Sequence, residues 1–409
     1  MLQTRFLLPV ALLGGTVLAI FGHNLQANQQ GTAGHTGPYP DVIVGDIHEL
    51  DENGTQNGQS AYSFGTTSCN IGTDILNWIS FNNQHPVIGS NLYRLKDGRF
   101  EMLGMSWLKH GFLALTGSAC NTCTGSGGNH LSPGCSDPYS AWLNGYQADL
   151  AARSEVNAYT GYFPYPPIIG GGTSGPLERR VIVDNVDVDP ALNGGARYFV
   201  ESQYITSDDS ALLGHGYNNV SWREVSISGA NPPYNMNFVG ATQREESAIE
   251  AWKSVDPGVT IVEIPVPNDG SMYLGYKVTA AAGGGWDYDY TLYNRDSDRS
   301  ARAIAVPVGA GTNLSAASFV DPEYHSGEPY VNTDWFSYDG LYPGTSQRVQ
   351  AWVGGSFNAN PDNNALRWGT SYTFHVHSDT APVAAQLGVI LFKPGGGSSL
   401  LFVPADVPQ

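Results

Sequence analysis

The chain has 409 residues, of which only 14% are charged, and it contains 50 glycines, 25 prolines and 22 tyrosines. This composition is typical of loop-rich, β-rich extracellular proteins and argues against a helical cytosolic enzyme. The formal net charge of −18 would repel a phosphate backbone, so we expect no nucleic-acid partner.

The N-terminal segment predicts a secretory signal peptide. Arg5 precedes an apolar run over residues 6–21, and Ala27 offers a small residue suitable for cleavage. The run is short and is interrupted by proline and glycine, which disfavours an uncleaved membrane anchor. We therefore expect a signal peptide over residues 1–27 and a flexible segment over 28–40. The mature chain should be secreted, either periplasmic or extracellular, with no membrane contact after cleavage.

The next part of the chain, residues 41–167, holds all four cysteines and is predicted to be an irregular β-rich domain that also contains histidines. In a secreted chain an even number of cysteines favours two disulfides, and three pairings are open. A Cys-x-x-Cys pair could instead bind zinc, with Cys69 or His130 among the ligands. One disulfide with two free thiols is a third alternative. The cysteines are Cys69, Cys120, Cys123 and Cys135.

Helical patterns are scarce along the whole chain. One run, Tyr139 to Val156, could form a helix that Asn144 and Gly145 interrupt, and Glu245 to Val255 could form another. Elsewhere the pattern is one of short alternating or β-branched runs between Gly, Asn, Pro and Asp clusters, such as GVTIVEIPVP and SYTFHVHSD.

These runs predict an all-β fold with two antiparallel β-sandwich or jelly-roll-like parts, few short helices and a disulfide-stabilised N-terminal part. A stretch rich in proline and glycine, residues 162–176, is interpreted as a linker or long crossover. Residues 168–257 form a connecting β-rich region that could belong to either half. Residues 258–409 are regular enough for one immunoglobulin-like sandwich.

The strand SYTFHVHSD carries the first candidate for chemistry. His375 and His377 point to one side of a strand, while Phe374 and Val376 point to the other, which suits a core. The two imidazoles would then face water or a neighbouring domain. They form half of a copper or zinc site, because alternation brings both rings within reach of one ion. The alternative is an ordinary solvated strand face.

Three further histidines extend this candidate metal set. His85 precedes a proline, His110 ends an apolar stretch, and His325 has Glu328 close by, which could orient or co-ligate it. We predict a metal site formed by His85, His110, His325, His375 and His377, with Glu328 as the catalytic carboxylate. Copper is the expected metal, and zinc or calcium are alternatives.

Other candidates for metal ligands have stronger structural interpretations. Met102 and Met105 could bind Cu(I), but filling gaps in the core is the better explanation. The Asp- and Asn-rich stretches DNVDVDP and NRDSDRS could bind calcium, although turns explain them better. Common hydrolase and nucleotide-binding motifs are missing from the sequence.

The aromatic content supports a different kind of function. Tracts such as GGGWDYDYTLY and YVNTDWFSYDGLY mix Tyr and Trp with Asp and Asn. Rings of this kind stack on sugar faces while carboxylates and carboxamides bind hydroxyls. Alternatively, the alternating tyrosines fill cross-strand pairs inside a sandwich.

Several sequence blocks resemble a family of large secreted proteins of environmental bacteria. The blocks are GTTSCNIG, NQHPVIGSNLYRLKDGRFEMLGMSWLKHGF, YHSGEPYVNTDW and NALRWGTSYTF, and they contain Cys69, His85, His110 and His325. The resemblance implies secretion and a two-part β-rich architecture, and it implies no particular reaction. In such proteins the strand after NALRWGT need not carry His-x-His, which argues against His375 and His377 as essential ligands.

Together these features predict a secreted metalloprotein, and more specifically a copper-dependent oxidoreductase. Its histidines would meet between the two halves and act on a small-molecule or extracellular polysaccharide substrate. The alternative is a non-catalytic carbohydrate-binding or cell-surface structural protein. A weaker alternative is a secreted glycan hydrolase or lyase, whose paired carboxylates the sequence does not single out.

Overall fold

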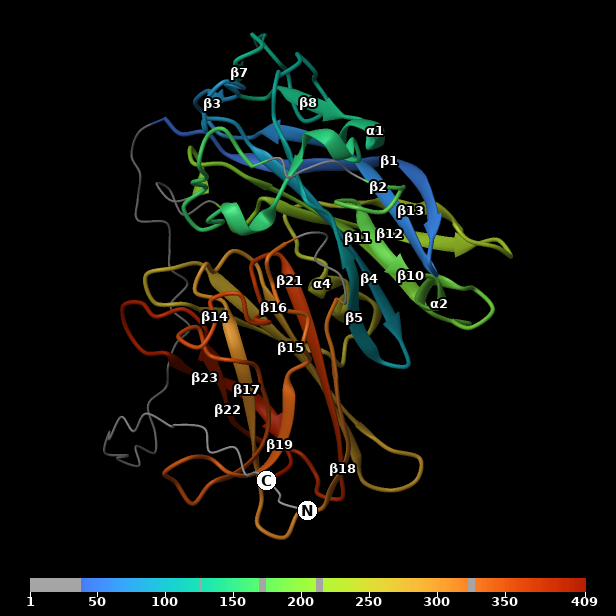
Figure 1. The fold of residues 1–409 in the computed structure, drawn as a ribbon, viewed down its shortest axis with the longest axis vertical. Helices are drawn as coiled ribbons and strands as arrows, with labels where there is room; N and C mark the ends of the chain where they lie inside the picture. Colours follow the sequence, from blue (N-terminus) through green and yellow to red (C-terminus); the bar gives the residue numbers. More distant parts are fainter. Residues whose placement is uncertain (1–37, 126, 169–173, 211–215, 323–327) are drawn as a thin grey trace.

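The computed structural model describes residues 38–125, 127–168, 174–210, 216–322 and 328–409. The predicted signal peptide, most of the predicted flexible segment and His325 lie outside these residues. Figure 1 shows two halves stacked along the long axis, each built from antiparallel sheets. The predicted all-β class, with two sandwich-like parts and few short helices, is confirmed.

The N-terminal half consists of β1 to β13 and contains two large sheets and a small two-stranded sheet. The first sheet has the order β1-β2-β10, with β8 also paired to β2. Its strands are β1 (Val42–Gln56), β2 (Gln59–Asn70), β8 (Ser136–Tyr139) and β10 (Val181–Asp184). A separate two-stranded sheet pairs β3 (Leu76–Asn77) with β7 (His130–Leu131).

The second large sheet of this half has the order β13-β12-β11-β4-β6-β9, with β5 paired to β4. Strands β10 to β13, from the connecting region of the sequence, therefore join the sheets of the N-terminal half. The seven strands are β4 (Val87–Lys96), β5 (Arg99–Met105), β6 (Leu108–His110), β9 (Leu150–Ala151), β11 (Arg197–Ile205), β12 (Val220–Ser228) and β13 (Asn235–Gln243).

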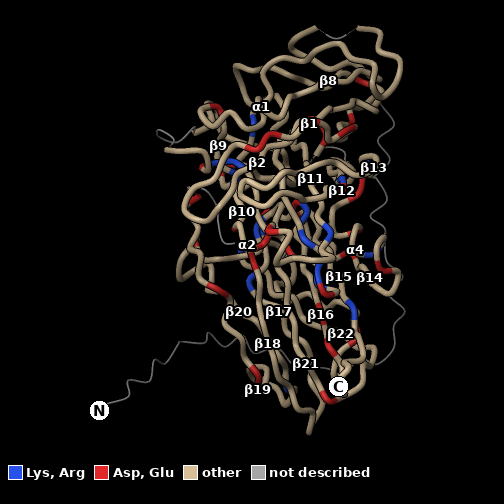
Figure 2. Tube along the Cα trace, turned by 90° about the vertical axis from the view of Figure 1, so that its right-hand side faces the viewer, with Lys and Arg blue, Asp and Glu red and all other residues tan. Residues whose placement is uncertain are grey.

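The C-terminal half is a sandwich of two five-stranded sheets whose strands run along the long axis (Figure 2). One sheet has the order β14-β15-β16-β21-β18, from β14 (Thr260–Pro265), β15 (Ser271–Ala280), β16 (Trp286–Asn294), β21 (Thr370–Ser378) and β18 (Leu314–Val320). The other has the order β19-β20-β17-β22-β23, from β19 (Phe336–Leu341), β20 (Arg348–Val353), β17 (Ala301–Val308), β22 (Val383–Leu391) and β23 (Leu400–Val407).

The helices of the described residues are short: α1 (Ala141–Asn144), α2 (Asn185–Val188) and α4 (Ile249–Val255), with 3-10 turns η1 (Gln147–Asp149) and η2 (Arg153–Glu155). Helix α4 confirms the pattern over residues 245–255 but starts later, because Glu245 has a φ of 63° that no right-handed helix allows. The run from Tyr139 breaks at Gly145, as predicted. None of these helices is long and apolar enough to cross a membrane.

Both disulfides lie in the N-terminal half and join Cys69 to Cys120 and Cys123 to Cys135. The prediction of two disulfides is confirmed, and the structure selects one of the three pairings. Because all four cysteines are paired, no thiolate is left to bind zinc. Such cross-links are typical of chains that fold in an oxidising compartment.

Each half has its own core, and a third apolar cluster joins them. The cluster at the junction contains Tyr93 and Phe100 from the N-terminal half, Trp252 from α4 and Tyr293 from the C-terminal half. Phe100 stacks on both Tyr93 and Trp252, with ring centroids 5.1 and 6.3 Å apart. Gly275 on β15 lets α4 approach closely, since a Cβ there would lie 3.2 Å from the Trp252 ring.

The junction also contains a buried polar network centred on Arg153, whose side chain is almost fully enclosed. Its Nε donates to the Ser106 carbonyl at 2.6 Å, and its Nη2 donates to the Ser90 carbonyl at 3.0 Å and to Asn91 Oδ1 at 2.9 Å. Its Nη1 donates to the carbonyl of Gly369, in the C-terminal half, at 3.3 Å. Burial lowers the pKa of Arg153 to about 10, so the guanidinium stays charged at neutral pH.

A buried carboxylate, Glu201, completes this network. Its Oε1 accepts from Asn91 Nδ2 at 2.8 Å and from the Tyr93 hydroxyl at 3.0 Å, and its Oε2 accepts from the Ala248 amide at 2.7 Å. Burial raises the pKa of Glu201, and the Asn91 amide links it to the guanidinium of Arg153. A buried charge is tolerated only when its hydrogen-bonding groups are satisfied.

Replacing Arg153 with methionine should destabilise the whole protein. The Arg153→Met change removes the cation, leaves the buried carbonyls of Ser90 and Ser106 without their donor, and removes the positive charge near Glu201. We therefore expect the free energy of unfolding to fall by about 3–5 kcal/mol. Chemical denaturation followed by tryptophan fluorescence measures this. The control is Arg197→Met, which removes an exposed ion pair with Glu224 and a contact over the Phe199 ring and should cost less than about 1 kcal/mol. Equal losses in the two variants would contradict the central role of Arg153.

Candidate functional site

Two of the predicted metal-binding histidines meet in the N-terminal half. His85 precedes β4 and His110 ends β6, and these two strands are paired with Val87 opposite His110. His85 Nε2 lies 2.9 Å from His110 Nδ1, and both rings contact Phe163, at centroid distances of 5.1 and 4.9 Å. Strand pairing therefore joins two imidazoles that are 25 residues apart in the chain.

Hydrogen bonding sets the tautomers of this pair. The Ile79 carbonyl can only accept, so His85 Nδ1, at 3.0 Å from it, carries the proton. Neutral His85 then accepts at Nε2 from His110 Nδ1, which leaves His110 Nε2 with a lone pair. Burial lowers the pKa of both rings, and that of His110 falls to about 3. His110 thus presents a neutral nitrogen that can act as a base or a metal ligand at physiological pH.

The other predicted pair, His375 and His377, lies on β21 in the C-terminal half. Phe374 and Val376 point into the sandwich core, as predicted, so the two imidazoles face the opposite side. Each ring is hydrogen-bonded to the aspartate directly across from it on β16. His375 Nδ1 lies 2.8 Å from Asp289 Oδ1, and His377 Nδ1 lies 2.8 Å from Asp287 Oδ1.

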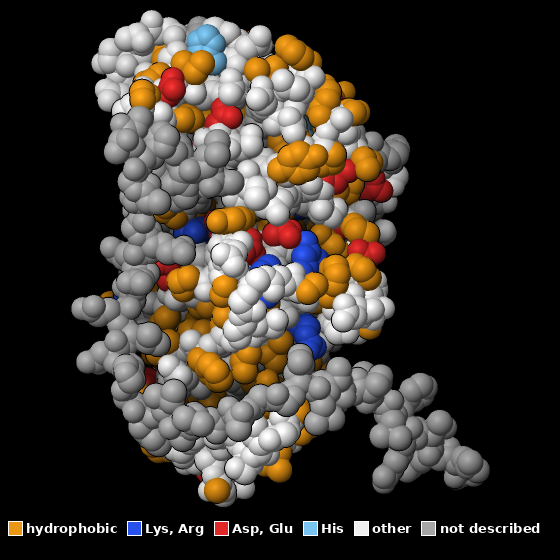
Figure 3. Space-filling model, turned by 90° about the vertical axis from the view of Figure 1, so that its left-hand side faces the viewer, with side chains coloured by type: hydrophobic (Ala, Val, Ile, Leu, Met, Phe, Trp, Pro, Cys, Tyr) orange, Lys and Arg blue, Asp and Glu red, His pale blue; other side chains and the backbone are white. Residues whose placement is uncertain are grey.

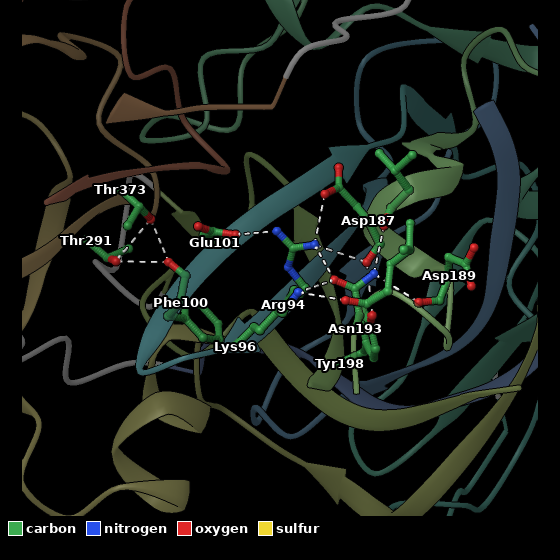
Figure 4. Close-up of polar contacts among 12 residues, drawn as sticks. Arg94, Lys96, Phe100, Glu101, Asp187, Asp189, Asn193, Tyr198, Thr291 and Thr373 are labelled. Atoms are coloured by element: carbon green, nitrogen blue, oxygen red, sulfur yellow. Dashed lines mark hydrogen bonds and ion pairs between the residues drawn. The ribbon is translucent and has the colours of Figure 1, made fainter. Parts of the chain in front are cut away.

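This outer face of the sheet is where the N-terminal half docks. Strand β5 reaches over β16 and β21, and Arg99 Nε on β5 donates to Asp289 Oδ1 at 3.0 Å. The Phe100 carbonyl accepts from the hydroxyls of Thr291 and Thr373, at 3.0 and 2.6 Å, as Figure 4 shows. His375 is therefore buried at the edge of the junction, whereas the side chain of His377 keeps 29% of its exposure.

The structure brings the predicted histidines together in pairs. Among the described residues, no group of three or more His, Cys, Asp or Glu side chains is placed to hold a metal ion. Since His325 lies outside those residues, the predicted five-histidine centre stays a prediction. Met102 and Met105 are buried in the junction cluster, where Met102 Sδ accepts from the Ser371 amide at 3.3 Å.

Glu328, the predicted catalytic carboxylate, binds backbone amides at the start of η2. Its carboxylate accepts from the amides of Arg153 and Ser154, and burial raises its pKa. Glu328 therefore caps the first turn of η2, which includes Arg153. A role for Glu328 in orienting a histidine ligand stays a prediction.

A cavity of about 220 Å³ lies beside the junction. Of its lining residues, Met102 and the aspartates of DNVDVDP were considered from the sequence as metal ligands, whereas Arg94 and Glu101 were not singled out. Arg94 on β4 donates from Nη2 to Glu101 Oε2 at 2.7 Å and from Nη1 to Asp187 Oδ1 at 2.8 Å (Figure 4). The acidic DNVDVDP stretch therefore forms α2 and an ion pair. On the opposite side of the molecule, Figure 3 shows the visible Lys and Arg side chains near the middle of the long axis. The cavity lining includes Arg94, Glu101, Asp184, Asp187, Met102 and Val320.

A buried acid, Asp137 on β8, was also missed. Burial raises its pKa to about 7, and its Oδ1 accepts from the Leu115 amide at 2.7 Å. The hydroxyl of Tyr139 nearby accepts from Trp78 Nε1 and from the Phe112 amide, at 3.1 and 3.0 Å. The only sequence signal was the position of Asp137 two residues after a cysteine. These contacts order the loop that follows His110.

The first aromatic tract lies mostly inside the molecule, whereas the second also exposes Phe336 and Tyr338 on β19, at 69% and 38%. Tyr288 and Tyr290 of GGGWDYDYTLY and Trp335 of YVNTDWFSYDGLY belong to the sandwich core, so cross-strand packing explains them. An exposed pair of aromatic rings in mutual contact lies elsewhere, at Trp142 on α1 and Tyr146 just after it. Their ring centroids are 5.0 Å apart and the rings are tilted by 33°. In the sequence, the exposure of Trp142 could have been inferred from its position between residues that favour turns, Ser140 before it and Asn144-Gly145 after it.

All nine tryptophans are described, and Trp142 alone is largely exposed, at 60% of its surface. Helix α1 is held from several sides. Ser140 Oγ accepts from the Leu143 amide at 3.2 Å, Glu49 Oε2 accepts from the Ala141 amide at 3.1 Å, and Asn144 Nδ2 donates to the Phe64 carbonyl at 2.8 Å. The indole thus stands on a rigid support.

Comparison with known proteins identifies no relative: no protein-family model matches this chain, and no curated protein matches it.

The lowered pKa of His110 predicts a pH dependence of stability. Between its ordinary value of 6.5 and about 3, unfolded His110 binds a proton that the folded protein does not bind. The folded state is therefore most stable with respect to His110 above pH 6.5, and the free energy of unfolding falls as the pH drops from 6.5 toward 3. In His110→Gln the free energy of unfolding should therefore fall less steeply between pH 7 and pH 4. Denaturant titrations across that range measure the slope, and His130→Gln, at a partly exposed histidine, should keep the parental slope. An unchanged slope in His110→Gln would refute the assignment.

Proposed function

We propose that this chain is an exported carbohydrate-binding protein and that Trp142 and Tyr146 form its ligand platform. The observation that carries the proposal is the 60% exposure of one indole in a chain whose other tryptophans are buried or half-buried. Burial of an aromatic side chain is favourable by roughly 1.5–3 kcal/mol. A ligand that covers the exposed indole would gain this free energy on binding, because the rigid support already holds the ring in place.

The geometry suits the apolar face of a sugar ring. The indole and the phenol are tilted to one another by 33°, so adjacent parts of a saccharide chain can contact both rings. Aromatic faces carry partial negative charge and attract the C–H groups of a pyranose face. Glu49, which caps α1, supplies an acceptor next to the platform. The net charge of −18 favours neutral or amino sugars over acidic polysaccharides.

Export is supported by two features of the chain. The first is the apolar N-terminal run with the properties of a signal peptide. The second is the pair of disulfides in the N-terminal half. The resemblance to secreted proteins of environmental bacteria points the same way and stays a prediction.

The enzymatic alternatives have weaker support. A copper-dependent oxidoreductase with its histidines between the halves stays a prediction, because the described candidate histidines meet only in pairs. A glycan hydrolase or lyase needs two carboxylates on either side of a sugar, and among the residues that the structure describes, the hydrogen bonds of α1 involve one carboxylate, Glu49. Binding without catalysis is therefore the function that the geometry supports best.

Replacing Trp142 with alanine should weaken polysaccharide binding. Loss of one stacking ring corresponds to about 1.4 kcal/mol, or roughly tenfold in Kd. Retention on insoluble cellulose, chitin and xylan, followed by titration with soluble oligosaccharides, measures the effect. The matched control is Phe402→Ala, which removes an exposed ring of 64% accessibility on β23 and should bind like the parent. Failure of the parent to bind any polysaccharide, or equal binding by Trp142→Ala, would overturn the proposal.

A further inference from the structure

We propose that the cavity beside the junction binds a small organic cation, namely an aliphatic amine with a short alkyl body. The cavity lies between β5, β10 and α2 of the N-terminal half and the end of β18 in the C-terminal half, so both halves form its walls. Interfaces between domains are a common place for small-molecule sites. The cavity shares no residue with the aromatic platform at Trp142, so the two proposals stand independently.

The charge of the lining residues favours a cation. Four carboxylates and one guanidinium line the cavity, which gives a formal charge of −3. In Figure 4 the guanidinium of Arg94 lies between Glu101 and Asp187, with ion pairs of 2.7 and 2.8 Å, so this cation is already engaged by two of the carboxylates. A recess lined mainly by one sign of charge attracts the opposite sign and repels its own. The four carboxylates are those of Glu101, Asp184, Asp187 and Asp321.

Three of these carboxylates can accept further hydrogen bonds. Asp184 Oδ1 accepts from the neutral amide of Gln59 at 2.8 Å, whereas Glu101 and Asp187 each use one oxygen for Arg94. Within the described parts of the chain, the second oxygen of each of these three side chains has no hydrogen-bond partner. An alkylammonium group has three N–H donors and no acceptor. It therefore matches the acceptors that the cavity offers.

A β-bulge gives β5 an unusual share of the lining. The pairing of β4 with β5 shifts register between Leu92 and Tyr93, which leaves Leu103 as an extra residue on β5. Three consecutive residues, Glu101, Met102 and Leu103, consequently line the cavity, whereas a regular strand would turn every second side chain away. Bulges that redirect side chains in this way are common beside binding and active sites.

The other walls also place apolar groups next to carboxylates. On β10, Ile182 and Asp184 point to the same side by alternation, and β18 ends at Val320, next to Asp321. Strand β10 packs closely against β5 because Gly104 has no side chain, and a Cβ there would collide with the Ile182 carbonyl. The cavity thus combines methyl and thioether groups with carboxylates, which suits a ligand with a hydrocarbon body and a charged end.

The volume of the cavity limits the size of the ligand. It is about 220 Å³, and an apolar cavity of about 150 Å³ accommodates a molecule as large as benzene. A ligand of about six to nine non-hydrogen atoms therefore fits, and 1,5-diaminopentane falls in this range. Among the residues that the structure describes, the carboxylates are not placed to share one metal ion, so an organic cation is the fitting ligand.

The test is titration of the purified full chain with matched small molecules. Isothermal titration with 1,5-diaminopentane should show one equivalent bound, with a Kd below about 1 mM. The neutral 1,5-pentanediol should bind at least tenfold more weakly, and the anionic glutarate should not bind. The shorter 1,3-diaminopropane should bind about 15-fold more weakly, because each buried methylene contributes about fourfold.

Variants locate the site. Asp184→Asn removes one charge with little change in size and should weaken diamine binding at least tenfold. The matched control is Asp74→Asn, which removes the same charge from an exposed aspartate outside the cavity and should leave the Kd unchanged. Circular dichroism and thermal melting confirm that both variants are folded. No binding by the parent up to about 10 mM diamine, equal Kd values in the two folded variants, or equal binding of the diol would overturn the proposal.

Discussion

The structure depends on one buried cation. The guanidinium of Arg153 donates to backbone carbonyls of Ser90 and Ser106 in the N-terminal half and of Gly369 in the C-terminal half. Removing a charge from water is costly, so this arrangement is stable only when each donor finds an acceptor. A methyl group on Gly369 would lie 2.7 Å from Nη1, and its φ of 68° suits glycine. The two halves therefore have a single docking geometry.

The docking of the two halves also positions polar side chains on the outer face of the C-terminal sheet. Strand β5 follows β4 in the same antiparallel pair, so fixing β4 through Ser90 and Asn91 also fixes Arg99 and Phe100. Arg99 then orients Asp289, and Asp289 orients His375. The imidazole is thus positioned by a residue from the other half of the molecule. The aromatic platform is positioned differently, by hydrogen bonds of α1 to Glu49 on β1 and to Phe64 on β2, within the N-terminal half.

The sequence patterns predicted the features that depend on local chemistry. Alternation placed Phe374 and Val376 in the core and the two histidines opposite them, and the even number of cysteines indicated two disulfides. Asn144-Gly145 correctly marked a break in the helical pattern. Each of these follows from properties of neighbouring residues, which a single sequence contains.

The sequence alone could not predict contacts that depend on how two strands are aligned with one another. His85 and His110 meet because β6 pairs with β4 at one particular offset, and no pattern in either strand specifies it. The partners of His375 and His377 are two aspartates about 90 residues away, in a tract that resembled a sugar-binding surface. Trp142 was one aromatic among many, and its exposure follows from the short helix that turns it away from both sheets.

The order of the chain gives the apolar junction a consequence for biosynthesis. The N-terminal half is translated first, and its Tyr93 and Phe100 lack part of their covering surface until α4 and the sandwich strands follow. Nascent chains with such uncovered apolar surface tend to aggregate and depend on chaperones. Complete folding of this protein is therefore expected to require its last 150 or so residues. Truncated products should expose this apolar surface and be degraded readily by quality-control proteases.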